Sequence, residues 1–185
     1  VDFSHMLVGP YCTLQLAHFG AEVIKVESRG RPDPWRFRDG NKDPEQSGPF
    51  ADHNRNKLSI TLNLKSARGV ELAKRLVQAS DVVIENFSVE VMGKLGLDYA
   101  NLRDVNPRII MVSLQGLGHT GPHAGHVTWG PNLLAFSGMN YLWSRPEDAE
   151  PVGTQTSYPD FAVGLYATGL ILAAAQIVLA WSGRQ

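Results

Sequence analysis

The chain has 185 residues, of which 43% are hydrophobic, and a net charge of −1. This length suffices for one α/β domain with a proper core but not for two. Because 17 basic residues balance 18 acidic ones, nucleic acid and anionic membrane surfaces are not expected as partners. The single cysteine, Cys12, excludes an intrachain disulfide and, without a signal peptide, favours a cytoplasmic location.

Five short segments have the patterns of strands. Val1–Phe3 and residues 23–27 are short apolar stretches, and residues 58–64 alternate between apolar and polar. Residues 82–84 and 109–112 are continuous apolar runs, which are typical of strands covered on both faces.

Helical patterns separate these strands. Ser66 is placed to cap a helix, and the other helical segments are residues 10–19, 89–95 and 99–105. The inner face predicted for the helix after Ser66 consists of Val70, Ala73, Leu76 and Val77. The alternation predicts an α/β fold with a Rossmann-like, mostly parallel sheet flanked by helices. A ligand cleft is then expected beyond the carboxyl ends of the strands.

Two stretches, residues 28–57 and 113–159, lack a regular pattern except for a helical piece at 132–136. Loops of this length in a compact domain are usually functional or disordered. Basic residues concentrate around the first: Lys25, Arg29, Arg31, Arg36, Arg38, Arg55 and Lys57. They either converge on a phosphate-bearing ligand at the strand ends or form a solvated charged loop. Trp35 and Phe37, interleaved with the arginines, could stack on a base.

The glycines of residues 116–121 have the spacing of a dinucleotide-binding loop. Pro122 follows, however, so no helix begins where a pyrophosphate would bind, and we expect a loop that closely approaches a ligand or another backbone. His119, His123 and His126 lie nearby without the spacing of metal ligands, and no metal site is predicted.

Asp160 stands where a polar loop gives way to a long apolar helix. It is either an ordinary helix N-cap or a carboxylate nucleophile, and in both cases the helix dipole should keep it ionised. No charged residue occurs in 161–181, which raises the possibility of a membrane span. Gly164, Thr168, Gly169 and Gln176, and the lack of a second such segment, favour a buried core or dimer helix instead. Because the sequence starts without Met and stops just after this helix, we expect part of a longer protein.

Several segments together resemble the amino-terminal part of the class III CoA-transferases, a family that includes formyl-CoA and carnitine-CoA transferases and α-methylacyl-CoA racemase. The segments are residues 1–5, 9–13, 20–27, 54–59, 62–65, 81–87, 95–97, 106–108, 118–122 and 137–138. The resemblance implies a fragment of an interlocked-dimer fold. Residues 1–159 would be a Rossmann-like CoA-binding domain and residues 160–185 the start of a long connecting helix, with the carboxyl-terminal domain missing.

The resemblance also implies a reaction. Asp160 aligns with the catalytic aspartate, which would move CoA from an acyl-CoA donor to a carboxylic acid through an aspartyl-CoA intermediate. Arg36 matches a position that contacts CoA phosphates, and the residues expected to bind CoA are His5, Met6, Leu7, Arg36, Lys57, Asn86, Phe87 and Lys94. Coenzyme A would enter as acyl-CoA substrate and no metal is expected. The full-length protein would be an interlocked homodimer that binds neither nucleic acid nor membrane.

Two departures from the family pattern keep alternatives open. Formyl- and oxalyl-transferring members have a glutamine where this chain has Leu7, which argues against those substrates. The racemase requires a histidine base at the position of Trp129, and His126 falls three residues short. An epimerase of the racemase type is therefore the first alternative, and a CoA-binding fragment without turnover is the second.

Overall fold

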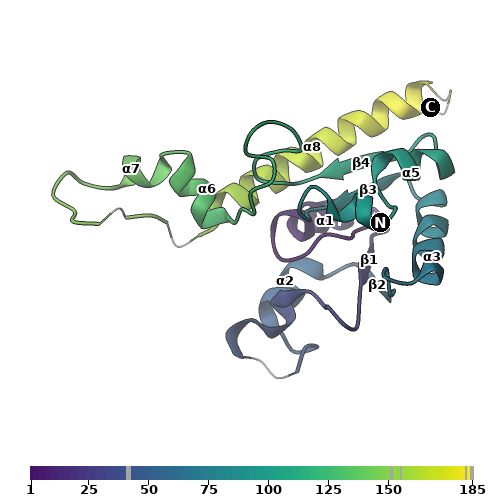
Figure 1. Cartoon of the computed structure of the whole chain (residues 1–185), viewed down its shortest axis with the longest axis horizontal. Coiled ribbons are helices and arrows are strands. Elements are labelled where there is room, and N and C mark those ends of the chain that lie inside the picture. Colours follow the sequence, from purple (N-terminus) through teal and green to yellow (C-terminus); the bar gives the residue numbers. More distant parts are fainter. Residues whose placement is uncertain (41–42, 151, 155, 182, 184–185) are drawn as a thin grey trace.

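The computed structural model describes the whole chain except residues 41, 42, 151, 155, 182, 184 and 185. Its sheet is built from short parallel strands in two pairs (Figure 1). In register, Ile24 lies opposite Leu58 in the first pair, and Val82 lies opposite Ile110 in the second. The strands are β1 (Ile24–Glu27), β2 (Leu58–Thr61), β3 (Val82–Glu85) and β4 (Ile110–Ser113).

The first residues of the chain join the two pairs. Asp2 forms parallel bridges to both Lys25 and Ile84. The Phe3 N–H donates to the Ile84 carbonyl at 2.9 Å, and the Val26 N–H donates to the Asp2 carbonyl at 2.8 Å. The order across the sheet is therefore β2, β1, residues 1–3, β3, β4. The mostly parallel sheet predicted from the sequence is confirmed, with the amino-terminal segment at its centre.

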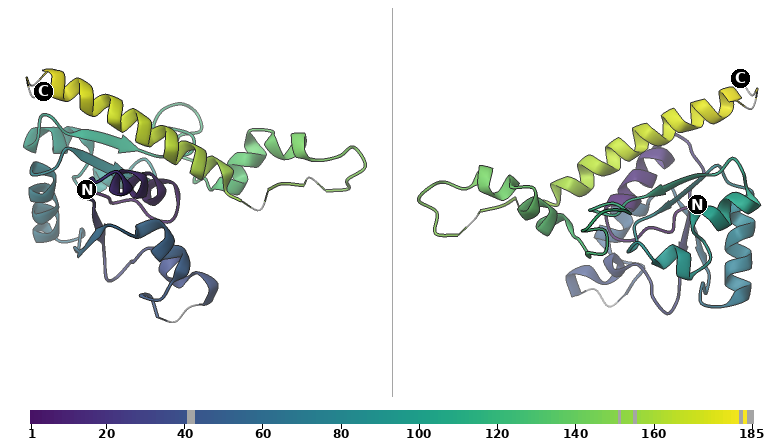
Figure 2. Two further views of the ribbon diagram at one scale, coloured as in Figure 1. Left: turned by 180° about the vertical axis from the view of Figure 1, so that it is seen from behind. Right: turned by 45° about the horizontal axis from the view of Figure 1, so that its top comes forward.

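Helices cover both faces of the sheet, because neighbouring strand residues point to opposite sides. Val83 belongs to a core with α3 (Ala67–Gln78), α4 (Val91–Lys94) and α5 (Tyr99–Val105). Ile84 belongs to a second core with Cys12 and Leu16 of α1 (Val8–His18) and with Ala167 and Ile171 of α8 (Tyr158–Trp181). Figure 2 shows α8 lying along β4 and α1 from two sides.

Local sequence signals explain the covering helices. The Ser66 hydroxyl caps α3 by accepting the Gly69 N–H at 3.1 Å, as predicted. Ala73 and Val77 are fully buried, and Val70 and Leu76 are partly buried, so the predicted inner face of α3 is confirmed.

The two irregular stretches contain more structure than the sequence indicated. The first folds into the 3-10 helix η1 (Pro34–Gly40) and the helix α2 (Gly48–Asn54), whose cap is Ser47. The second contains α6 (Gly130–Phe136) and α7 (Met139–Trp143). The part of the chain that holds α6 and α7, residues 130–150, 152–154, 156 and 157, projects away from the sheet in both Figures 1 and 2; we name it the arm.

Helix α8 is long and mostly exposed. By length and apolar composition it is the one described helix able to cross a membrane, which is weak evidence because core helices share both properties. Only 22% of its apolar window is buried, so α8 is not a core helix within this chain, and the other expectation, a dimer helix, stays a prediction. Its contact side is sharply defined: Gly164, Ala167, Thr168 and Ile171 are buried against α1 and the sheet.

Candidate active site

Three of the predicted CoA-binding residues meet beyond the carboxyl ends of the central strands. The His5 N–H donates to the Asn86 side-chain oxygen at 2.8 Å, and the Asn86 amide donates back to the His5 carbonyl at 2.7 Å. The His5 ring stands edge-on to Phe87, with centroids 5.3 Å apart. Burial and the nearby Lys25 lower the pKa of His5, which favours a neutral ring beside the loops after residues 1–3 and β3.

Met6 and Leu7 form the turn from the central segment into α1. Met6 has a positive φ of 69°, which is unusual for a residue other than glycine. Its N–H donates to both carboxylate oxygens of Asp33, at 3.0 and 3.1 Å. Leu7 is buried and precedes the first turn of α1. A carboxylate from the segment after β1, residues 28–57, which we name the excursion, therefore holds this turn in place.

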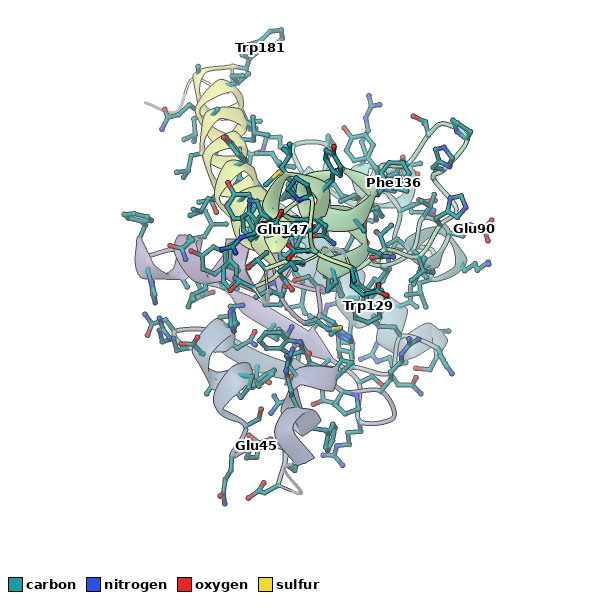
Figure 3. The ribbon with its side chains drawn as sticks, turned by 90° about the vertical axis from the view of Figure 1, so that its left-hand side faces the viewer. Glu45, Glu90, Trp129, Phe136, Glu147 and Trp181 are labelled. Carbon is teal, nitrogen blue, oxygen red and sulfur yellow. The ribbon has the colours of Figure 1, made fainter. Side chains whose placement is uncertain are left out.

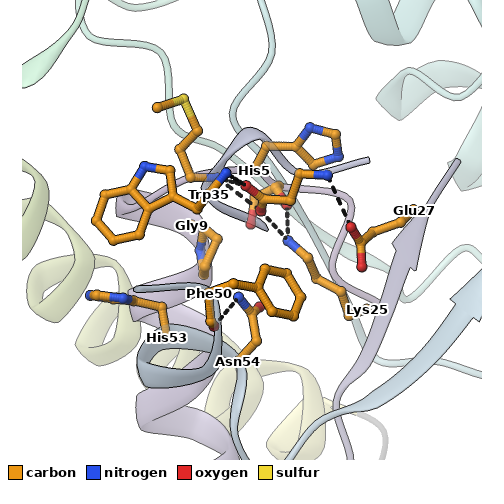
Figure 4. A network of polar contacts seen from close by, with 12 residues as sticks. His5, Gly9, Lys25, Glu27, Trp35, Phe50, His53 and Asn54 are labelled. Atoms are coloured by element: carbon orange, nitrogen blue, oxygen red, sulfur yellow. Dashed lines mark hydrogen bonds and ion pairs between the residues drawn. The ribbon is translucent and has the colours of Figure 1, made fainter. Parts of the chain in front are cut away.

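A buried polar network surrounds the turn, and Figure 4 shows its centre. Lys25 and Asp33 form an ion pair at 3.1 Å with side chains 2% and 0% exposed. Asp33 also accepts the Trp35 N–H at 3.0 Å, while Lys25 donates to the Ser4 carbonyl. Asp33 was not identified from the sequence, and its neighbours Pro32 and Pro34 suggest only a turn.

Lys57 is fully engaged inside the protein. Its ammonium donates to Asp2 Oδ2 at 3.2 Å, to the Pro10 carbonyl at 2.9 Å and to Asn54 Oδ1 at 2.9 Å. These contacts use all three of its protons. Burial lowers the pKa of Lys57 to about 8, and this lysine connects β2, α1 and α2 to the centre of the sheet.

Arg36 is also paired. Its guanidinium donates to both oxygens of Glu27, at 2.6 and 2.9 Å, and to Glu45 at 3.1 Å. It lies 3.6 Å from the centroid of the Phe50 ring, and hydrogen bonding to Glu27 raises the pKa of Arg36. A phosphate at this site would therefore have to share the guanidinium with Glu27.

A cavity of about 510 Å³ connects these cations, and its wall includes Lys25, Arg29, Arg36 and Lys57. Arg29 is exposed, and among the described residues its guanidinium has no hydrogen-bond or ion-pair partner. Four of the basic residues singled out in the sequence thus line one cavity. Lys94 does not take part, because it lies exposed on α4 and pairs with Glu90.

Asp160 is the third residue of α8, not its N-cap. Its backbone N–H donates to the Ser157 carbonyl at 3.0 Å. Burial raises the pKa of the Asp160 carboxyl to about 6, and a backbone hydrogen bond opposes this rise only in part. The group is therefore still mostly ionised at neutral pH, as expected, but burial holds its pKa above the ordinary value of 3.8.

Aromatic rings link the start of α8 to the excursion. The Phe161 ring stands edge-on to Tyr11 at 4.9 Å and lies 6.1 Å from the His53 ring. Trp35 in turn contacts His53 at 4.9 Å. About one helical turn farther along α8, Gly164 packs directly on the backbone of α1 at Val8. The helix of Asp160 thus runs beside α1, with Asp160 near the end where α1 begins.

The glycine loop after β4 has no helix following it, as the sequence predicted. Gly118 and Gly121 have positive φ values of 75° and 96°, which explains glycine at both positions. Gln115, which sequence reasoning missed, donates to Glu85 Oε1 at 2.8 Å and to the Phe87 carbonyl at 2.9 Å. It thereby fixes the loop that carries Asn86 and Phe87.

The histidines of this loop contact residues other than Asp160: His119 Nε2 lies 3.9 Å from Glu85, and the His123 ring packs on Phe136. His123 and His126 lie with ring centroids 5.3 Å apart, and both are exposed. Within the described ranges, no group of three or more His, Cys, Asp or Glu side chains is arranged to hold a metal ion. Trp129 occupies the position before α6 and is labelled in Figure 3.

The fold and this site define an α/β protein with a polar cleft at the strand ends and a half-buried carboxylate at the start of a long helix. The chain belongs to the CoA-transferase family III, which it matches over residues 1–178. This confirms the family expected from the sequence.

Comparison with known proteins gives consistent results. The chain is 41% identical over 182 residues to an acyl-CoA transferase of Fusarium pseudograminearum and 37% identical over 173 residues to the mouse succinyl-CoA:glutarate CoA-transferase. Both alignments include 94% of this chain but only 40% and 39% of the relatives. The chain therefore spans about two fifths of the length of these relatives.

A solved structure supports the same assignment. A CAIB/BAIF family protein from Brucella suis superposes with a TM-score of 0.89 at 35% identity, and the match covers 98% of this chain and 48% of that protein. A protein from Mycobacterium tuberculosis gives 0.86 at 31% identity, with 98% and 49% coverage. The fold described here is thus the amino-terminal half of the fold in these proteins.

Proposed function

We propose that this chain is the CoA-binding part of a CoA-transferase that moves CoA from an acyl-CoA to a carboxylic acid, with Asp160 as nucleophile. The observation that carries the proposal is the half-buried Asp160 carboxylate, whose pKa of about 6 lies between that of a solvated aspartate and neutral pH. Such a group is ionised at pH 7 but weakly solvated, which favours nucleophilic attack. Membership of the family supports the same role.

The reaction that the family resemblance implies proceeds by exchange of acyl bonds. An Asp160 oxygen attacks the thioester carbonyl of the donor, the carbon–sulfur bond breaks, and CoA leaves as the thiolate. The thiolate attacks the Asp160 carbonyl of the mixed anhydride, releasing the donor acid as carboxylate and forming the aspartyl-CoA thioester. The acceptor carboxylate then attacks this thioester and displaces the thiolate. Attack of the thiolate on the new acyl carbonyl forms the product acyl-CoA and restores Asp160.

The CoA site in this proposal lies at the strand ends. His5, Met6, Asn86 and Phe87 are partly exposed there, and paired hydrogen bonds hold His5 to Asn86. Leu7 is buried at the start of α1 and would support this surface from beneath. The cavity lined by Arg29, Arg36 and Lys57 would receive the phosphates. Lys94, exposed on α4 and outside this cavity, would reach CoA only after leaving its pair with Glu90.

The names of similar proteins indicate the acceptor acid, and the exposed side of α8 indicates a second copy of the chain as protein partner. Similar proteins are named for the transfer of CoA to glutarate, L-malate or oxalate, so short dicarboxylic acids are the acceptors to test first. The exposed apolar side of α8, including Leu165, Tyr166 and Leu170, would be covered in an interlocked homodimer of the full-length protein. We place this protein in the cytoplasm.

The decisive experiment uses the full-length protein that contains this chain. After addition of succinyl-CoA, hydroxylamine should convert Asp160 to its hydroxamate, detectable by peptide mass spectrometry, and borohydride should reduce the same acyl group. Asp160→Asn should abolish transfer and trapping while CoA still binds. The matched control is Asp104→Asn, at an exposed position on α5, which should behave as wild type.

Two other outcomes identify the alternatives. Solvent deuterium exchange at the α-carbon of the acyl group, without trapping, would identify an epimerase. CoA binding with neither signal would leave a non-catalytic CoA-binding protein. Transfer that survives Asp160→Asn would disprove the proposed nucleophile.

A further inference from the structure

Gly130, the first residue of α6, lies directly against the carboxyl group of Asp160. A Cβ atom at this position would overlap Asp160 Oδ2 and lie 2.8 Å from Ser157 Cβ. At such separations one of the atoms must shift, so a side chain at residue 130 would force the Asp160 carboxylate or Ser157 out of its present position.

The backbone at Gly130 does not itself require glycine. Gly118, Gly121 and Gly138 have positive φ values, whereas Gly130 is not among the residues with positive φ. As the first residue of a helix, it has a conformation that alanine readily adopts. Glycine is needed at this position for the contact and not for the turn.

The contact also closes the base of the arm. The chain leaves the body at α6 and returns at Ser157, whose carbonyl accepts the Asp160 N–H at 3.0 Å. Gly130 is buried against both residues, and α6 packs on α8 at this point. The start of α6 therefore lies beside the start of α8 (Figure 1), and the Asp160 carboxylate lies against Gly130 at this point.

We propose that Gly130 is a positioning residue for Asp160, an inference that rests on the proposed function. Because Gly130 has no side chain, the carboxylate can lie directly against the start of α6, and this contact fixes its orientation. Any side chain at residue 130 displaces the carboxylate from the line of attack on the thioester. Displacements of about 1 Å in a reacting group commonly reduce rates about 100-fold.

The test measures Gly130→Ala in the full-length protein with succinyl-CoA as donor and glutarate as acceptor. We expect kcat to fall about 100-fold, with the KM for succinyl-CoA and the stoichiometry of CoA binding unchanged. Hydroxamate formation at Asp160 should slow by the same factor. The control is Gly169→Ala on α8, where a Cβ meets nothing within 4 Å, and it should retain the wild-type kcat.

A double-mutant cycle of Gly130→Ala and Asp160→Ala, measured by thermal unfolding, gives a second test, which also applies if Gly130→Ala is unstable. The Tm loss caused by Gly130→Ala should be smaller in an Asp160→Ala background, because the overlapping oxygen is gone. An equal loss in both backgrounds, or a Gly130→Ala enzyme with wild-type kcat, overturns the inference. If Asp160→Ala itself retains transfer, the proposed function fails instead, and the positioning role with it.

Discussion

Lys57 Nζ lies 3.2 Å from Asp2 Oδ2, and the two side chains are 1% and 0% exposed. This pair joins the start of β2 to the segment at the centre of the sheet, although 55 residues separate the partners. Burial alone would raise the pKa of Asp2, but Lys25 and Lys57 hold it well below its usual value. The pair is therefore part of what fixes the central segment.

Removing the lysine should destabilise the fold strongly. Lys57→Met leaves the Asp2 carboxylate buried with one cation fewer, and loss of one partner of a buried pair typically costs about 3–5 kcal/mol. Urea unfolding measures the change. Lys94→Met, which breaks the exposed pair with Glu90, should stay within about 1 kcal/mol of wild type. Equal effects of the two substitutions would contradict the importance of the buried pair.

Two glycines of α8 should respond oppositely to alanine. A Cβ at Gly164 would lie 2.9 Å from Tyr11 Cδ1 and 3.1 Å from the Val8 carbonyl oxygen, whereas Gly169 faces open space. Gly164→Ala should destabilise by about 1–3 kcal/mol because α8 must move away from α1. Gly169→Ala should stabilise by about 0.5–1 kcal/mol through helix propensity. A stabilised Gly164→Ala protein would show that the two helices do not approach as described.

Transfer should be lost in mild acid. The nucleophile must be ionised, and the pKa of Asp160 is about 6, so kcat/KM should fall roughly tenfold per pH unit below about pH 6. Initial rates between pH 4.5 and 8 check this. An acidic limb near pH 4 would indicate a fully solvated carboxylate instead.

The same burial predicts a pH-dependent effect on stability. The folded-state pKa of Asp160, about 6, lies above its ordinary value of 3.8. The folded state thus binds more protons between these values, and the ionised group destabilises the fold above about pH 6. Asp160→Asn should then stabilise the protein by on the order of 1 kcal/mol at pH 7.5, after allowance for partial exposure, and by nearly nothing at pH 4. A gain that is the same at both pH values would rule out the buried charge as its cause.

Alanine substitutions of Arg36 and Arg29 distinguish a cation that both stabilises the fold and binds CoA from one that only binds CoA. Arg36→Ala leaves Glu27 without its bidentate partner and should cost about 3 kcal/mol. Arg29→Ala should change stability by less than about 0.5 kcal/mol. Both should weaken CoA binding measured by calorimetry below the unfolding range. An unchanged dissociation constant for either variant would remove that arginine from the CoA site.

Local patterns predicted the sheet and its covering helices well. Val82–Glu85 and the helix after Ser66 were recognisable because apolar periodicity and a cap are encoded within a few neighbouring residues. The interior of the excursion was not, since Asp33 accepts the N–H of Met6, which lies 27 residues earlier, and pairs with Lys25 through a side chain that no periodicity indicates. Prolines and glycines also concealed η1 and α2.

For the candidate site, the family resemblance proposed Asp160 but not its surroundings. Its raised pKa depends on burial, and its contact with Gly130 depends on the return of the arm to α8, neither of which leaves a periodic signal. The pairing of Arg36 and Lys57 with carboxylates was likewise hidden, because a list of basic residues does not show which charges are neutralised inside the fold.

The position of residues 1–3 between β1 and β3 has a consequence for biosynthesis. These residues leave the ribosome before β1 and β3, yet the Phe3 N–H donates to the Ile84 carbonyl. The nascent chain must therefore keep residues 1–3 available until the 81 further residues up to Ile84 have been made. Closure of the sheet is then a late, long-range step, and the half-made protein is the form most in need of a chaperone.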